Sequence, residues 1–171
     1  MTSLATIIES MLLRDLDGLR RELARYPDDE SLWELPEGLP NSGGTLALHL
    51  AGNLRHYIGA VLGANGYVRD REWEFAARHV PRADILREID AAEQAVRTVL
   101  PRLTEERLQS DFPEIIANGY RIRTGAYLIQ IAVHFAYHLG QISYHRRTVT
   151  GDSQGVNAAA TPELSIAVPV A

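Results

Sequence analysis

Hydrophobic residues recur at three- and four-residue steps in four long stretches of the chain, which is the spacing of one buried face on an α-helix. The predicted helices cover residues 3–26, residues 45–65, a stretch from Pro81 whose apolar face extends to Leu103, and residues 124–149. Pro81 is expected at the first helical position, where its missing N–H needs no partner. Gly66 follows the second helix and favours a stop there. Four such helices predict an all-α four-helix bundle, and a simple up-down-up-down order would make the second and fourth helices parallel.

Two segments depart from the helical pattern. Residues 111–123 place Asn118-Gly119 between β-prone runs, which predicts a short two-stranded hairpin or an irregular loop along the same path. Residues 151–171 are poor in charge and rich in Ala, Val, Pro and Ser, a composition typical of a flexible tail that a partner subunit could order. The expected organisation is one bundle over residues 1–150 followed by this C-terminal tail.

Composition narrows the classes of function. The 171 residues are 46% hydrophobic and carry a net charge of -5, with no long basic run, so a nucleic-acid partner is not expected. The N-terminus lacks the charged start of a secretory signal, and no stretch approaches the roughly 20 apolar residues that span a bilayer, so we expect a cytoplasmic protein. With no cysteine, the chain offers neither a thiolate zinc site nor a thiol nucleophile of its own.

The last predicted helix carries the most informative pattern. Its three histidines and four further residues fall within one arc of roughly 100° on the helix surface. These seven residues are Tyr127, Gln130, Ile131, His134, His138, Gln141 and His145. The other faces of its first half are apolar, which indicates burial on more than one side. Because His134 and His138 are one turn apart, about 6 Å between Cβ atoms, their nitrogens can meet on one cation.

His49 is the candidate third ligand. It lies about one turn into the second helix, at the edge of that helix's apolar face. Imidazole suits zinc, nickel, iron and copper better than magnesium or calcium. Three imidazoles would leave a position open for water or another exogenous ligand, as in catalytic zinc sites. The competing interpretation is that these histidines are ordinary core residues, because the HxxxH spacing also arises by chance.

The remaining candidates allow both readings. Gln141 and Asn53 could hydrogen-bond to the ligands or simply pack between helices. His56 and His145 could line the same cavity, although helix-end or surface positions are favoured, and His79 is expected to face solvent. Tyr57 and Tyr137 are expected to be core aromatics rather than proton donors. In the 67–81 segment, the favoured interpretation of the polar residues is a loop salt bridge, the alternative being an anion-binding cavity mouth; they are Arg69, Arg71 and Glu72.

The residues around the three histidines resemble a known family. Residues 46–53, Leu-Ala-Leu-His-Leu-Ala-Gly-Asn, and the run from His134 to Ile142, His-Phe-Ala-Tyr-His-Leu-Gly-Gln-Ile, are similar to the DinB/YfiT superfamily over about residues 3–150. The resemblance implies an up-down-down-up or similar bundle, a zinc or nickel ion on His49, His134 and His138, and a homodimer. It also implies a thiol-dependent transferase or isomerase in which the metal lowers the pKa of an external low-molecular-weight thiol.

Two main hypotheses follow. In the first, the chain is a metal-dependent enzyme, either a thiol transferase or a hydrolase, that acts on an unknown small-molecule substrate in a pocket between the second and fourth helices. In the second, it is a non-catalytic dimer that binds a metal or a small molecule. A weaker third idea is a stress-response protein that binds other chains through an exposed apolar patch.

Overall fold

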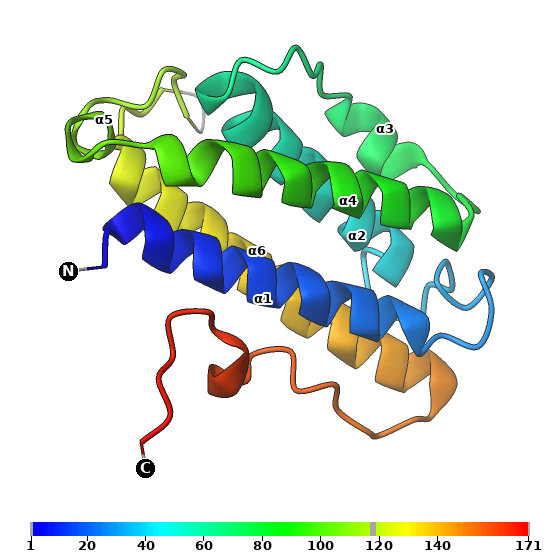
Figure 1. The fold of residues 1–171 in the computed structure, drawn as a ribbon. Helices are drawn as coiled ribbons and strands as arrows, with labels where there is room; N and C mark the ends of the chain where they lie inside the picture. Colours follow the sequence, from blue (N-terminus) through cyan, green and yellow to red (C-terminus); the bar gives the residue numbers. More distant parts are fainter. Residues whose placement is uncertain (1, 117–118, 171) are drawn as a thin grey trace.

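Four long helices lie side by side and form the bundle (Figure 1). They are α1 (Leu4–Ala24), α2 (Gly43–Leu54), α4 (Arg82–Val99) and α6 (Thr124–Thr150). The structure is a computed structural model that describes residues 2–116 and 119–170. The predicted all-α class and all four long helices are confirmed.

Side chains and glycines at the helix ends account for the boundaries. Ser3 and Ser42 precede α1 and α2, and each hydroxyl accepts a hydrogen bond from a backbone N–H three residues later. Such a cap satisfies one of the N–H groups that a helix start leaves without a partner. Helix α6 ends at Thr150. The next residue, Gly151, has a φ of 69°, the left-handed conformation that glycine adopts without a steric penalty. Pro81 is the cap of α4 and not its first residue, so that detail of the prediction was wrong by one position.

The second predicted helix changes its winding part-way. Helix α2 ends at Leu54, and η1 (Arg55–Leu62) continues it as a π-helix, with a bond from the Gly63 N–H to the Ile58 carbonyl at 3.0 Å. The wider turns occur where the backbone lies close to α4: a Cβ at Gly59 would be 3.2 Å from Ala95 Cβ. Stretches of π-helix are frequent beside functional sites.

Shorter elements lie between the long helices and after the last one, and the sequence pattern did not predict them as separate elements. They are α3 (Arg71–Ala76), η2 (Leu100–Arg102), α5 (Glu105–Gln109) and η3 (Thr161–Glu163). Between α5 and α6, the described residues contain no strand and only two isolated bridges, Asp111 with Arg123 and Ile116 with Tyr120. The irregular loop is therefore the correct alternative of the two predicted, and Asn118 of the expected turn lies outside the described residues.

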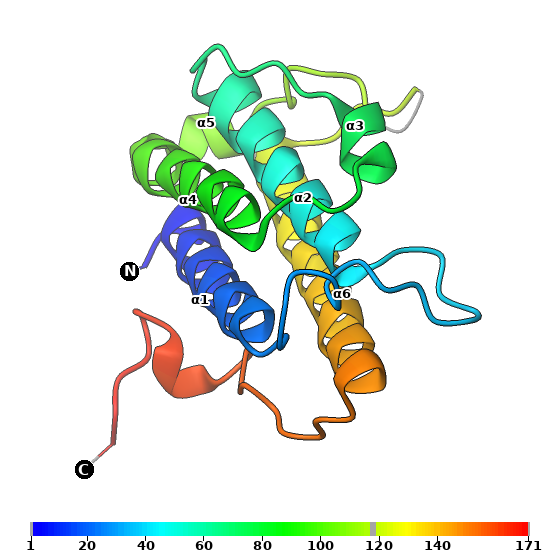
Figure 2. The ribbon, with the colours of Figure 1, turned by 90° about the vertical axis from the view of Figure 1, so that its right-hand side faces the viewer.

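The order of helix directions differs from the simple prediction. Tyr26 at the end of α1 contacts His145 near the end of α6, so these two helices are parallel. Along α2 and α6 the order is reversed, because His49 contacts His138 whereas the later Tyr57 contacts Tyr127. The bundle therefore runs up-down-down-up, as the family resemblance implied, and the predicted parallel α2 and α6 were wrong (Figure 2). The long connection over residues 63–81 returns along the bundle and allows α2 and α4 to run in the same direction.

The core lies between the four helices, where four leucines of α1 are fully buried, as their spacing predicts. These are Leu12, Leu16, Leu19 and Leu23. Burying each such side chain stabilises the fold by about 1.5–3 kcal/mol relative to exposure. Within the described part of the chain, no helix has both the length and the hydropathy to cross a membrane.

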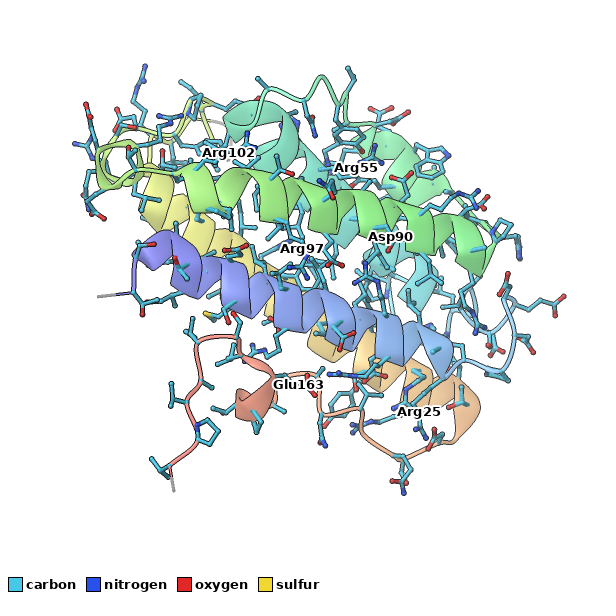
Figure 3. The ribbon with its side chains drawn as sticks, viewed as in Figure 1. Arg25, Arg55, Asp90, Arg97, Arg102 and Glu163 are labelled. Atoms are coloured by element: carbon cyan, nitrogen blue, oxygen red, sulfur yellow. The ribbon has the colours of Figure 1, made fainter. Side chains whose placement is uncertain are left out.

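The C-terminal segment packs against α1 and α6 of the same chain. Arg146 donates to the carbonyls of Asp152 at 3.0 Å and Gln154 at 2.5 Å. Further along, Glu163 accepts from Arg21 at 2.6 Å, and Figure 3 labels Glu163 beside α1. These contacts lie within one chain, and the ordering of this segment by a partner subunit stays a prediction.

Candidate metal centre

Helices α2 and α6 bring three histidines to one point inside the bundle. The ring centroids of His49 lie 5.2 Å from His134 and 5.4 Å from His138, and the latter two are 4.5 Å apart. One nitrogen from each ring can be chosen so that all three lie within 4.8 Å of one another. The predicted trio is confirmed as a group that could hold a metal ion, although it forms between antiparallel helices.

The distance between one pair of ring nitrogens is compatible with two ligands on one divalent transition metal. His49 Nε2 and His134 Nε2 lie 3.4 Å apart. Two nitrogens bound to one tetrahedral zinc at about 2.0–2.1 Å would be about 3.3–3.4 Å apart. Three neutral imidazoles also form the donor set that such metals prefer over magnesium or calcium.

Gln141 sets the orientation of the His138 ring. Its Oε1 accepts a hydrogen bond from His138 Nδ1 at 2.6 Å. A carbonyl oxygen can only accept, so the proton resides on Nδ1, and Nε2 keeps its lone pair for a ligand bond. This contact agrees with the role predicted for Gln141.

A buried carboxylate does the same for His49. Glu74 is 2% exposed, and its Oε2 lies 3.1 Å from His49 Nδ1. The carboxylate also accepts two hydrogen bonds from Arg69, each 2.7 Å long. Glu74 Oε2, which can only accept, favours a proton on His49 Nδ1, whereas Arg69 Nη2, which can only donate, lies 3.2 Å from the same atom. His49 presents its other nitrogen, Nε2, towards His134. Metal-binding histidines commonly hold a carboxylate in this way, which fixes the tautomer and raises the basicity of the ligand.

Local structure explains why Glu74 reaches the site. Asp70 caps α3 by accepting from the Trp73 N–H at 2.8 Å, and this short helix turns Glu74 inward. Gly52 on α2 leaves the necessary space, because a Cβ there would collide with Glu74 Oε1. Phe75, next along α3, packs its ring 4.8 Å from that of His49.

The electrostatics of the site favour the neutral form of His134 and His138. Burial, together with His138, His49 and Arg69, lowers the pKa of His134 to about 4. Burial, followed by His49, also lowers the pKa of His138. Burial acts to raise the pKa of Glu74, but hydrogen bonds from Arg69 and His49 outweigh it and hold this pKa below its usual value. Neutral imidazoles are the form that binds metals.

A cleft of 510 Å³ opens beside His49 and His134, within the size range of small-molecule sites. It lies between α2 and α6, with Arg69 and Arg71 from the connection over the bundle, in agreement with the predicted pocket. Its other lining residues are Asn53, Tyr57, Ile116, Ile122, Tyr127, Gln130 and Ile131. The site therefore combines a possible metal position with space for a bound molecule.

Comparison with known families places the chain. The model of the family described as "Protein of unknown function (DUF1572)" matches residues 8–158. The chain belongs to the DUF1572 family. No curated protein matches it in a search by sequence. The DUF1572 match covers the bundle from residue 8 of α1 onward and all three clustered histidines.

The other histidines of this DUF1572 chain lie away from the cluster. His145 is buried and contacts Tyr26 Oη at 2.8 Å and the Glu34 carbonyl at 2.8 Å. His56 pairs with Glu114 at 3.1 Å, and His79 is exposed, as predicted. His56 and His145 both lie outside the metal cluster, as the favoured interpretation has it. His145 is near the end of α6, although it is buried and does not lie at the surface.

Among the remaining predicted residues, Asn53 lines the cleft and is buried. The ring of Tyr57 packs edge-to-face against that of Tyr127, with 5.1 Å between the ring centroids. Tyr137, expected in the core, is 64% exposed. The expected salt bridge within Arg69, Arg71 and Glu72 is wrong in its acid, because Arg69 pairs with Glu74.

Sequence reasoning missed Glu74. The run Asp70-Arg71-Glu72-Trp73-Glu74 contains two glutamates, and its composition does not distinguish the inward one. Only the Asp70 cap, which fixes where the short helix starts and so which face Glu74 occupies, offers a usable signal.

Proposed function

We propose that this DUF1572 protein is a DinB-like, metal-dependent enzyme that uses a small external thiol in a transfer reaction, or water in a hydrolysis, on a small-molecule substrate. The convergence of His49, His134 and His138 next to a 510 Å³ cleft is the observation that carries the proposal. A metal held only for structure needs no such space, whereas a catalytic metal needs an open position and room for the substrate.

The residues of the chain divide the work. The three histidines hold a divalent ion, with zinc or nickel favoured by the donor set. When bound, such a metal lowers the pKa of a thiol or water that coordinates it. Glu74 and Gln141 hold two of the imidazoles in the required tautomer. Tyr57 and Tyr127 form an aromatic wall that limits access of water to the reacting groups.

Elemental analysis and activity test this proposal together. Native protein is analysed for bound metals, stripped with a chelator and reloaded with zinc or nickel. Each form is assayed for conjugation of glutathione or 2-mercaptoethanol to an aryl chloride, and for hydrolysis of an aryl ester. We expect about one ion per chain and activity only in the loaded forms. Stripped protein that reacts as fast as loaded protein would contradict the mechanism.

A non-catalytic dimer is the alternative, and the outer face of α6 favours the dimeric part of it. Four large apolar side chains on this face are exposed in the single chain: Ile129, Val133, Tyr137 and Tyr144. A contiguous apolar patch on a helix is typical of an interaction surface. We propose that two copies pair through it, and light scattering of the wild type and of Val133→Glu tests this. A fourth protein ligand on the metal, seen by X-ray absorption, would favour the non-catalytic role.

A further inference from the structure

The charge around the cleft is unusual for this protein. The chain has 22 acidic residues against 17 basic ones, yet the described residues that line the cleft include two arginines and no carboxylate. Nearby acids are already paired, Glu74 with Arg69 and Glu114 with His56. A metal ion on the histidines would add further positive charge. The cleft is therefore suited to a negatively charged ligand.

Arg71 is the side chain that is available to bind that charge. Arg69 uses its guanidinium to hold Glu74. Arg71 has no carboxylate within salt-bridge distance among the residues that the structure describes. Its guanidinium carbon lies 4.8 Å from the centroid of Phe75, and Phe75 in turn packs on His49. This stacking holds the cationic group at the cleft, one ring away from a metal-ligating histidine.

A second part of the cleft lining is apolar. It consists of Ile122 and Ile131 together with the rings of Tyr57 and Tyr127, which pack edge-to-face. Such a wall favours an aliphatic or aromatic body and gives no partner to a second charge. The two parts of the lining thus recognise the two ends of an amphipathic molecule.

We propose that the substrate class of this site is a small amphipathic anion, whose carboxylate or phosphate pairs with Arg71 while its apolar body packs against Ile122, Ile131 and the tyrosines. The inference rests on the proposed function for the reaction, but the anion site itself depends only on the lining of the cleft. Arg71 is a specificity residue in this scheme.

Calorimetric titration of zinc-loaded protein with acetate, hexanoate and 1-hexanol tests the proposal. Hexanoate has both the charge and the apolar body, whereas acetate and 1-hexanol each lack one. We expect hexanoate to bind most tightly, with a gain of up to about fourfold for each CH₂ beyond acetate. Equal binding of hexanoate and 1-hexanol, or no binding of hexanoate, would overturn the proposal.

Matched arginine variants test whether the anion pairs with Arg71. Arg71→Gln is expected to weaken hexanoate binding at least about tenfold, and Arg71→Lys to weaken it less. Arg102→Gln removes the same charge from η2, outside the cleft lining, and is expected to bind like the wild type (Figure 3). Equal losses in Arg71→Gln and Arg102→Gln would show a general charge effect and overturn the anion site.

Repeating the titration on chelator-treated protein separates the two proposals. We expect binding that depends on Arg71 to persist without metal. Protein that binds no zinc but retains this dependence would contradict the proposed function and support the anion site. Zinc binding without any dependence on Arg71 would leave the proposed function intact and overturn the anion site.

Discussion

Helix α6 carries two buried polar regions that differ in how fully their groups are satisfied. Near its end, His145 has a protein partner on each ring nitrogen, and the adjacent Arg146 donates to Glu22, Asp152 and Gln154. Three turns earlier, His134 points its Nε2 at the Nε2 of His49. The two nitrogens lie 3.4 Å apart, a distance at which the rings can share a proton or hold one cation between them.

The contrast separates a structural region from a ligand-binding one. Buried polar groups in a fold are normally satisfied by the protein itself, as around Arg146. Histidines that converge on a position that one cation could occupy are typical of a binding site. The same helix therefore stabilises the fold at one end and presents donors to a ligand near its middle. Changes in the two regions should have separable consequences.

The largest effect is expected from breaking the structural region. Arg146→Met leaves the carboxylate of Glu22, 1% exposed, without its partner at 2.5 Å. An uncompensated buried charge costs about 3–5 kcal/mol. We expect urea denaturation to show a loss of that order, partly recovered in the double variant Glu22→Gln/Arg146→Met. Zinc content per folded chain should not change, and a parallel loss of metal would show that the two regions are not independent.

Removal of a metal-ligating histidine should lower the affinity for zinc and leave the fold in place. Structural zinc sites bind with about 10–16 kcal/mol, so one of a few ligands contributes about 3–4 kcal/mol, or roughly 100- to 1,000-fold in affinity. His134→Ala is expected to lose zinc by this factor in a competition assay with a chromophoric chelator, while the helical circular dichroism remains. His79→Ala, at an exposed histidine, is the matched control. Full zinc affinity in His134→Ala would remove the basis of the metal centre.

Loss of the carboxylate on His49 should have a smaller effect. Glu74→Gln keeps the shape of the side chain but removes its charge, and such changes cost about 10- to 100-fold in metal affinity. Glu72→Gln on the same short helix removes an equal charge from an exposed position. Competition with the chelator measures both. Identical affinities for the two variants would mean that Glu74 only supports the packing of α3.

The smallest predicted effect, taken per pH unit, is the response of metal-free protein to pH. The pKa of His134 is about 4 in the folded chain and about 6.5 in the unfolded chain, so the unfolded state binds the extra proton between these values. The free energy of unfolding should therefore fall as the pH falls from about 6.5 to about 4, and this residue contributes at most about 1.4 kcal/mol per pH unit. His134→Gln should show a shallower slope in the same denaturation series. Equal slopes would argue against a neutral, buried His134.

The sequence predicted the parts of the site that depend on helical spacing. His134 and His138 are adjacent on one helix, and their shared face follows from the period of 3.6 residues alone. Gln141 follows from the same spacing. His49 could be predicted from its place near the start of the second helix and from the family resemblance, because its inward face is also set by periodicity.

The remaining features depend on tertiary contacts. The direction of α2 relative to α6 is set by the long connection over residues 63–81, and hydrophobic periodicity is the same for either direction. Glu74 reaches His49 only because that connection folds back over the bundle and contains the short helix α3. The placement of the C-terminal segment depends on Arg146, which looks in the sequence like an ordinary basic residue at a helix end.

Gly52 shows what the binding region costs the fold. Glycine in a helix interior is less favourable than alanine by about 1 kcal/mol, so Gly52→Ala would normally strengthen α2. Here a single methyl group would occupy the space of the Glu74 carboxylate. The carboxylate would have to move away, and its contact with His49 Nδ1 would be lost. At this position a more stable helix and the Glu74 contact that orients His49 exclude each other. A search for thermostable variants that ignored the metal would therefore select against the site.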